Sequence, residues 1–227
     1  MMNKYSIEEL IRKAEGRSAL LEHEVKGLLK KMGFSVPNGI FIISGEPMPE
    51  IPDLAYPLVA KVSSEKISSR SDLHGVRTCL RDMEEVKIAV EELLRIESAE
   101  GVLIEEMAPA GLEVIVGGVI DPQFGPVMMF GLGGVFVELY KDVSFGLAPL
   151  SKDDADWMIK EIKGHRLLEG YRGSPPVDKD ALKEILVGTS AIMATGLVAE
   201  IDFNPVTLYA KGAMVLDAKM NLRAQKP

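Results

Sequence analysis

Apolar and polar residues alternate along two runs near the C-terminus, and Lys211 and Gly212 separate the runs. A period of two is typical of strands with one buried and one wet face, and a glycine after a polar residue suits a tight turn. The pattern predicts a β-hairpin over residues 200–219. A two-residue turn places Val206 opposite Asp217 and sets Asp217 diagonal to Asn204. The polar face then carries Glu200, Asp202, Asn204, Val206 and Asp217, and the core face carries Ile201, Phe203, Leu216 and Ala218.

Other segments show helical periodicity or short apolar runs bounded by turn residues. Helices are predicted over 6–16, 19–33, 82–98, 151–163 and 178–195, the first with Ser6 and Glu9 at capping-box spacing. Strands are predicted over 39–43, 56–64, 101–107, 112–120, 126–131 and 135–140. Because hairpin-length turns join the central strands, we expect an α+β fold with an antiparallel sheet, and a boundary between two lobes near residue 100.

Composition and charge exclude several classes of protein. The chain has 227 residues, 47% of them hydrophobic, with a net charge of −8. An acidic chain is a poor candidate for binding nucleic-acid phosphates. The longest apolar run, residues 126–137, is too short to span a bilayer, and the polar N-terminus lacks a signal-peptide core. With Cys79 as its single cysteine, the chain is expected to be cytoplasmic, without membrane or nucleic-acid partners.

The polar face of the hairpin is a candidate metal site. Asp202, Asn204 and Asp217 supply carboxylate and amide oxygens on a stiff pair of strands. Such oxygens suit Mg²⁺, which keeps several waters and bridges to phosphates. A solvated sheet face with no ligand is the alternative, and spacing alone favours it.

Lys61 lies in an otherwise apolar predicted strand. A buried ammonium needs an anionic partner, and a phosphate would serve. The alternative is a lysine on an edge strand that reaches water along the surface.

Two further segments are candidate ligand contacts. The connector between the strands 101–107 and 112–120 carries Glu105, Glu106 and Glu113, where a cofactor ring could lie between lobes; a solvated turn is the alternative. The glycine-rich segment 130–138 lacks the Lys-Ser/Thr of a Walker A loop, so it is either a tight turn or a close approach to a ligand. His23, His74 and His165 show no metal-ligand spacing.

Taken in order, several segments resemble the β subunit of ADP-forming acyl-CoA synthetases (acetate–CoA ligase, ADP-forming). The resemblance covers essentially the whole chain, and its most specific element is "DPQFGPVMMFGLGGVFVE" (121–138). The other matching segments are 14–37, 57–64, 71–76, 111–145, 167–176 and 200–219.

This resemblance implies an ATP-grasp fold, in which two α+β lobes with antiparallel sheets grip ADP or ATP. Residues 1–100 would form the N-terminal helices and small lobe, and residues 101–227 the C-terminal lobe with the metal-binding hairpin. Each candidate residue then has an implied role. Lys61 would reach the nucleotide phosphates, Glu105, Glu106 and Met107 would form the adenine hinge, Glu113 would lie beside the nucleotide, and Asn204 and Asp217 would bind Mg²⁺ with Asp202 close by.

The implied reaction is acyl-CoA + ADP + phosphate ⇌ acid + CoA + ATP. A CoA-binding α subunit would carry a phosphorylated histidine and form an α2β2 heterotetramer with this chain, which would pass the phosphoryl group to ADP. The acid substrate is not implied, because its pocket would lie on the α subunit.

The chain departs from the family pattern at two places. It has "SRSDLHGV" (69–76) where the family reads His-Lys-Ser-Asp-Val-Gly-Gly-Val, so Ser69 replaces the histidine that relays the phosphoryl group. Gly146 replaces a family arginine. His74, five residues after Ser69, is a candidate substitute for the relay because imidazole forms a labile phosphoryl link. The alternative is a nucleotide-binding regulatory or scaffold subunit that has lost the relay.

Overall fold

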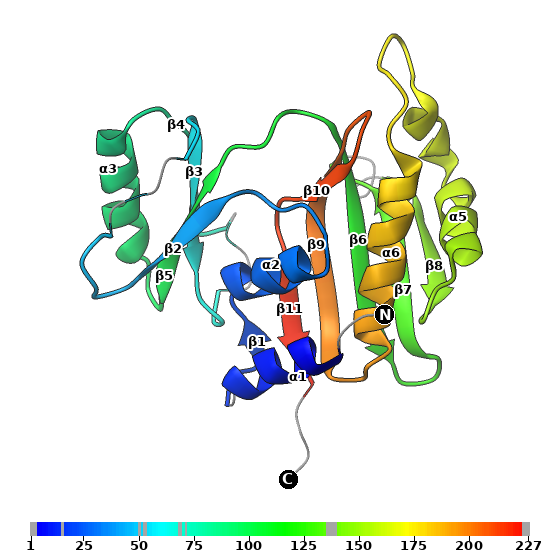
Figure 1. The fold of residues 1–227 in the computed structure, drawn as a ribbon, viewed down its shortest axis with the longest axis horizontal. Helices are drawn as coiled ribbons and strands as arrows, with labels where there is room; N and C mark the ends of the chain where they lie inside the picture. The colour runs from blue at the N-terminus through cyan, green and yellow to red at the C-terminus, as the bar shows by residue number, and fades with distance from the viewer. Residues whose placement is uncertain are drawn as a thin grey trace. The chain divides into compact units, whose positions relative to one another are not determined.

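The computed structural model describes residues 4–14, 16–49, 51, 54–67, 70, 72–134 and 140–223. The chain divides into two compact units (Figure 1). The larger unit comprises Met1–Leu20, Glu24–Val36 and Ala110–Pro227, and the smaller unit comprises Leu21–His23 and Pro37–Pro109.

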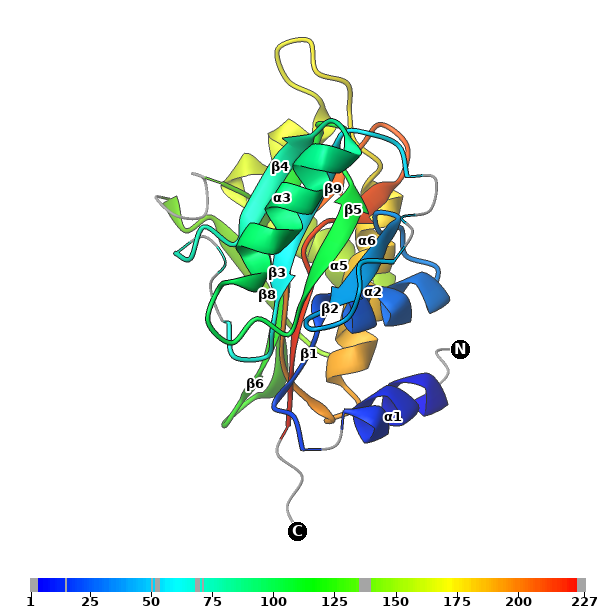
Figure 2. The same cartoon turned by 90° about the vertical axis from the view of Figure 1, so that its left-hand side faces the viewer.

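The smaller unit is built on an antiparallel four-stranded sheet in the order β2-β5-β3-β4. Its strands are β2 (Gly39–Ile43), β3 (Leu58–Ser63), β4 (Val76–Leu80) and β5 (Gly101–Glu106). Helix α3 (Met83–Leu94) lies across one face of this sheet (Figure 2). The helix begins at Asp82, whose carboxylate accepts the Glu85 N–H at 2.9 Å and so satisfies a donor of the first turn.

The larger unit contains a seven-stranded sheet, also antiparallel, in the order β1-β11-β9-β6-β7-β8 with β10 paired to β9. The strands are β1 (Ala19–Leu20), β6 (Leu112–Asp121), β7 (Gly125–Leu132), β8 (Val143–Leu147), β9 (Val198–Leu208), β10 (Ala213–Val215) and β11 (Lys219–Leu222). The helices are α1 (Lys4–Lys13), α2 (Glu22–Lys31), α5 (Lys152–Glu161), the 3-10 helix η1 (Lys163–Glu169) and α6 (Lys179–Met193).

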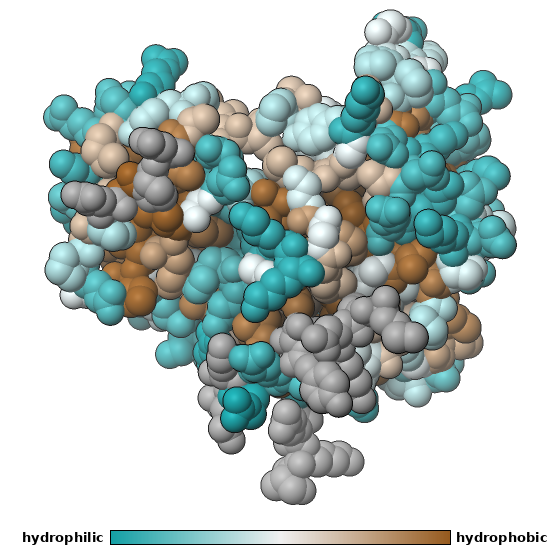
Figure 3. Space-filling model, in the orientation of Figure 1, coloured by the Kyte–Doolittle hydropathy of each residue, from teal (hydrophilic) through white to brown (hydrophobic). Residues whose placement is uncertain are grey.

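Each unit has its own apolar core, which fixes the strands that carry the candidate residues. In the larger unit, α6 packs on β6, β7 and β9, and α5 packs on β8. Phe130 and Phe203 are fully buried between these elements. The outer side of the α5 region is mainly hydrophilic (Figure 3), as expected for a helix that buries only one face.

The prediction of an α+β fold with antiparallel sheets is confirmed. The units divide at Pro109–Ala110 rather than near residue 100, because β5 pairs with β2 and β3 and so belongs to the smaller sheet. Helix α2 is shared: Glu22 and His23 belong to the smaller unit, and Val25 lies in the core of the larger one. How these units correspond to functional lobes stays a prediction.

Several local predictions differ from the structure. Ala19 and Leu20, predicted as the start of a helix over 19–33, form strand β1, and α2 begins at Glu22. The capping box at Ser6 is wrong, because α1 already begins at Lys4 and Ser6 lies within it. Strands β4 and β8 are additional to those predicted, since their sequences alternate weakly. The predicted strand over 135–140 falls largely on residues 135–139, which lie outside the described part of the chain. Over the residues that the structure describes, no helix combines the length and apolar character that crossing a bilayer demands.

Candidate functional site: a carboxylate hairpin and a buried lysine

The predicted hairpin is present, with a four-residue turn instead of a two-residue one. Leu208 pairs with Ala213, so the turn comprises residues 209–212. Lys219 of β11 pairs with Asp202 in the same register. Asp217 therefore lies level with Asn204 rather than diagonal to it, and the Asn204 N–H donates to the Asp217 carbonyl at 3.3 Å. The two proposed metal ligands are closer neighbours than the sequence predicted.

A β-bulge in β9 shapes the polar face. Strand β6 pairs Val114 with Val206 and Val116 with Phe203, so two residues of β9, Asn204 and Pro205, lie opposite one residue of β6. A bulge reverses which face the following residues point to. As a result Phe203 and Val206 are both fully buried while Asn204 is exposed.

The prediction that Val206 shares the polar face is therefore wrong, because strict alternation does not continue through the bulge. The core positions predicted for Ile201, Phe203 and Ala218 are confirmed. Leu216, predicted as core, is only half-buried.

Negative charge accumulates on the polar face of this hairpin. Burial raises the pKa of the Asp202 carboxyl, and the carboxylates of Asp217 and Glu200 raise it further, while Lys219 acts in the opposite direction. Glu200 is itself held by the Asn221 side-chain amide, which donates to Oε2 at 2.6 Å. The face thus has an excess of negative charge that a divalent cation would offset.

The donor set fits Mg²⁺. Asn204 offers an amide oxygen, and Asp217 and Asp202 offer carboxylates on adjacent chain segments. Within the described residues, no three His, Cys, Asp or Glu side chains group closely enough to enclose a metal by themselves. An amide oxygen and carboxylate oxygens are ligands that Mg²⁺ accepts, because it binds through one or two carboxylates and keeps water and phosphate ligands.

The raised pKa of Asp202 leads to a prediction that can be tested without substrate. Because the folded chain holds this proton more tightly than the unfolded chain, the free energy of unfolding falls as pH rises from the ordinary pKa of 3.8 through the raised pKa. Without metal, Asp202→Asn should therefore raise Tm at neutral pH by about 1–3 °C. Scanning calorimetry with and without Mg²⁺ checks this. A lower Tm in the variant would contradict this prediction. So would a Tm difference between variant and wild type that is the same at pH 4 and at pH 7.

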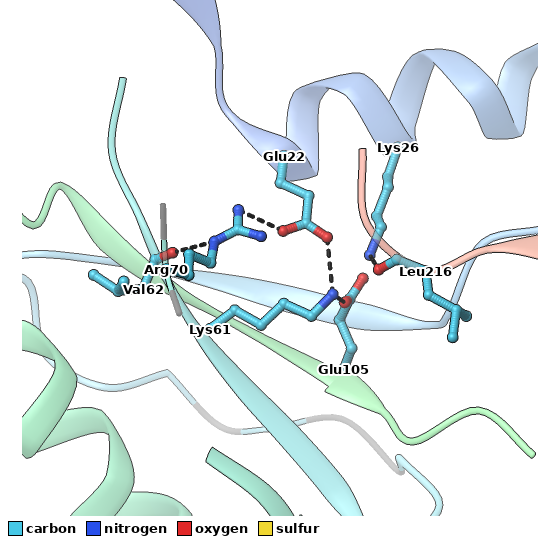
Figure 4. Close-up of polar contacts among 7 residues, drawn as sticks. All are labelled: Glu22, Lys26, Lys61, Val62, Arg70, Glu105 and Leu216. Atoms are coloured by element: carbon cyan, nitrogen blue, oxygen red, sulfur yellow. Dashed lines mark hydrogen bonds and ion pairs between the residues drawn. The ribbon is translucent and has the colours of Figure 1, made fainter. Parts of the chain in front are cut away.

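Lys61 is buried and paired. Its strand β3 lies between β5 and β4, and Lys61 is 8% exposed, so the interpretation as an edge-strand lysine is wrong. The ammonium Nζ lies 2.9 Å from Glu22 Oε1 and 3.0 Å from Glu105 Oε2 (Figure 4). The anionic partners that burial requires are thus two carboxylates of the same unit.

Arg70 extends this network. Its Nη2 lies 2.6 Å from Glu22 Oε2, and its Nε donates to the Val62 carbonyl at 2.9 Å. Glu22 is absent from the predicted site, although the sequence carries a signal for it. Glu22 follows Leu21 and precedes Val25 by three residues, so it lies on the apolar face of its helix, where an exposed glutamate is not expected.

The predicted hinge is held by local hydrogen bonds. The Glu106 carboxylate accepts the Asn38 side-chain amide at 3.0 Å and the Ala55 N–H at 2.9 Å. The Met107 N–H donates to the Pro57 carbonyl at 3.0 Å. The Glu106 side chain therefore stabilises the connector, and adenine binding by the backbone of residues 105–107 stays a prediction.

The glycine-rich segment follows β7 in the larger unit. The Gly133 N–H donates to the Glu113 carbonyl at 2.8 Å, and a Cβ at Gly133 would lie 3.0 Å from that oxygen. Gly134 has φ +63°, which favours glycine. Close packing against β6 therefore explains Gly133, and the backbone conformation explains Gly134, without a ligand. Glu113 itself is exposed at the start of β6, so its role beside a nucleotide stays a prediction.

The departures from the family pattern lie in different surroundings. His74 is exposed in a turn with φ +50°, and its carbonyl accepts a hydrogen bond from Arg77. Ser69 lies outside the described residues. A Cβ at Gly146 would lie 2.7 Å from Met158 Sδ and 2.8 Å from Leu150 Cδ2, so an arginine there would require these core side chains to move.

Asp178 is a further residue that the sequence did not single out. Its carboxylate accepts the Ala181 N–H at 3.0 Å and the Gly212 N–H at 2.8 Å, and its own N–H donates to the Tyr209 carbonyl at 2.8 Å. The hydrogen bonds that the carboxylate accepts, from Ala181 first and Gly212 second, lower the pKa of Asp178. Asp178 thus fastens the turn of the β9–β10 hairpin to the start of α6.

Comparison with known proteins supports the resemblance. A family model described as an ATP-grasp domain matches residues 12–222. The chain is 40% identical over 226 residues to the β subunit of acetate–CoA ligase (ADP-forming) I of Pyrococcus furiosus, covering 94% of this chain and 97% of that subunit. It is 41% identical over 208 residues to acetate–CoA ligase (ADP-forming) II of Archaeoglobus fulgidus, covering 91% of this chain but 31% of that longer protein.

A solved structure is similar over nearly the whole chain. It is a dinucleotide-forming acetyl-coenzyme A synthetase of Ca. Korarchaeum cryptofilum, with 44% identity and a TM-score of 0.79, covering 96% of this chain and 100% of that one. That protein was solved with coenzyme A and Mg-AMPPCP, its phosphohistidine segment pointing towards the nucleotide binding site.

Proposed function

Because the chain belongs to the ATP-grasp family and, within it, to the β subunits of ADP-forming acetate–CoA ligases, we propose that it transfers a phosphoryl group between a partner-subunit phosphohistidine and ADP or ATP. The observation that carries the proposal is the similarity to a complete β subunit, 97% of which is covered. The net reaction of the whole enzyme is acyl-CoA + ADP + phosphate ⇌ acid + CoA + ATP.

The candidate residues take the following roles in this proposal. Lys61 contacts the nucleotide phosphates and offsets charge on the transferring group. Asn204 and Asp217, with Asp202 beside them, would hold Mg²⁺, which when bound stabilises the negative charge of the phosphates. Support comes from the buried, carboxylate-paired ammonium of Lys61 and from the surplus of negative charge around Asp202. Residues Glu105, Glu106 and Met107 bind adenine through their backbone, and Glu113 lies beside the nucleotide.

The partner in this proposal is an α subunit that binds CoA and carries the phosphorylated histidine. The subunit name of the Pyrococcus relative and the coenzyme A in the Korarchaeum structure support such a partner. We propose an α2β2 heterotetramer. Mass measurement of the co-expressed complex under native conditions tests the stoichiometry.

The isolated chain should bind MgADP and MgATP with micromolar to millimolar dissociation constants and should form no acyl-CoA. Isothermal titration calorimetry measures the binding, and a CoA-thioester assay with and without a co-expressed α subunit measures the reaction. Absence of nucleotide binding would remove the proposed function. Thioester formation by the purified single chain would instead remove the need for a partner.

A second candidate function rests on Ser69. A serine forms stable phosphate esters, whereas an imidazole forms a labile link suited to a relay, so the chain could be a nucleotide-binding regulatory or scaffold subunit without the relay. Against this, His74 lies in an exposed turn nearby in the sequence, and we propose it as the replacement relay.

The relay proposal predicts acid-labile phosphate on this chain that is lost in His74→Ala. The complex is run backward from ATP carrying a labelled γ-phosphate, quenched, and separated into its subunits under alkaline conditions. His165→Ala is the matched control and should keep the label. If the label never reaches this chain, or survives in His74→Ala, the scaffold function gains support.

A further inference from the structure

Four charged side chains of the smaller unit form a row of alternating sign. In order they are Arg70, Glu22, Lys61 and Glu105, joined by contacts of 2.6, 2.9 and 3.0 Å (Figure 4). The ammonium of Lys61 lies between the two carboxylates, and Arg70 contacts only the outer oxygen of Glu22. The side chain of Glu22 is fully buried, and those of Glu105 and Lys61 are 2% and 10% exposed. Water therefore screens these charges only weakly.

We propose that Glu22 makes the phosphate site at Lys61 selective for metal-bound over metal-free nucleotide. The inference rests on the proposed role of Lys61 as a phosphate contact. A nucleotide phosphate that reaches this ammonium meets a cation whose single charge is already outweighed by two fixed carboxylates. Metal-free ADP brings its full negative charge against those carboxylates, whereas a bound Mg²⁺ removes two units of that charge. The repulsion from Glu22 therefore acts mainly on the metal-free form.

The carboxylate of Glu22 is fixed from both of its oxygens. Oε1 contacts Lys61, and Oε2 contacts Arg70, whose guanidinium is in turn held by the Val62 carbonyl. Glu22 is also the first residue of α2, where the helix dipole favours a negative charge. A phosphate that displaced the Glu22 carboxylate would also break its contact with Arg70. Glu22 is accordingly a specificity-determining residue that acts through Lys61, since it need not touch the nucleotide itself.

The test compares ADP binding in excess Mg²⁺ and in EDTA by isothermal titration calorimetry. The wild-type chain should bind MgADP at least about tenfold more tightly than metal-free ADP. Glu22→Gln keeps the shape and removes one negative charge. It should tighten binding of metal-free ADP by about tenfold or more and of MgADP by less than about threefold. Glu91→Gln removes an equal charge from the exposed face of α3, where the side chain is 73% exposed. It should leave the ratio of the dissociation constants for metal-free ADP and MgADP unchanged.

A second variant keeps the inference testable if Glu22→Gln does not fold. Arg70→Gln leaves Glu22 paired with Lys61 and removes one positive charge. It should therefore weaken the binding of metal-free ADP more than the binding of MgADP.

The outcomes separate this inference from the proposed function. If the wild-type chain binds neither form of ADP, the proposed function fails. If it binds both forms equally, or if Glu22→Gln and Arg70→Gln change both affinities by the same factor, only the selectivity inference is overturned. A shift of the ratio in opposite directions in the two variants supports it.

Discussion

Asp217→Ala and Asn204→Ala are each expected to abolish Mg²⁺-dependent nucleotide turnover while leaving the fold intact. Asn204 is exposed and Asp217 is half-buried on the wet face of the hairpin, so neither truncation opens a cavity in the core. Because the Mg²⁺ site has so few protein ligands, removing either one should cost several kcal/mol of transition-state stabilisation. This loss corresponds to a decrease in rate of about a thousandfold. Turnover of the complex over a range of Mg²⁺ concentrations measures the loss.

Glu200→Gln is the matched control for these variants. Glu200 lies on the same strand as Asn204, and the variant removes a carboxylate. Because the Glu200 side chain is engaged by Asn221, the variant should retain turnover within about tenfold. Circular dichroism should show unchanged secondary structure in all three variants. Near-normal turnover in Asp217→Ala or Asn204→Ala would remove the metal assignment.

Lys61→Met should lose nucleotide binding and also destabilise the chain strongly. The methionine approximates the lysine in size, so packing is retained, but the buried carboxylates of Glu22 and Glu105 lose their shared cation. Removing one partner from a buried ion pair costs about 3 kcal/mol or more. Urea denaturation measures the stability, and calorimetry with MgADP measures binding.

A triple variant separates the two effects of Lys61. Lys61→Met combined with Glu22→Gln and Glu105→Gln removes the uncompensated charges and should recover most of the lost stability, yet it should not recover nucleotide binding. Lys87→Met, on the exposed face of α3, is the control and should change neither property. Wild-type affinity for MgADP in Lys61→Met would show that Lys61 serves the fold alone.

Periodicity in the sequence predicted the elements that carry the site. Strand 39–43 is reproduced residue for residue, and the hairpin with its polar residues Asn204 and Asp217 follows from alternation. Lys61 stood out because it interrupts an otherwise apolar run. These features depend on the local order of apolar and polar residues, which can be read directly from the sequence.

The geometry of the site depends on contacts between distant segments, which local patterns do not encode. The bulge at Asn204–Pro205 arises where β9 pairs with β6, about 90 residues away in the chain. The row from Arg70 to Glu105 joins one helix and a separate sheet, so Glu22 becomes a partner of Lys61 only in the folded chain. The resemblance to a family named the roles of several residues but offered none for Glu22 or Asp178.

The central claim is that this chain carries phosphoryl groups between a partner's histidine and a nucleotide. The most direct measurement incubates the CoA-binding α subunit with ATP labelled at the γ-phosphate and follows acid-labile label on that subunit. Labelling should appear only when this chain is added and should be lost with Asp217→Ala. Labelling of the α subunit without this chain, or its absence from a folded complex that binds MgATP, would contradict the claim.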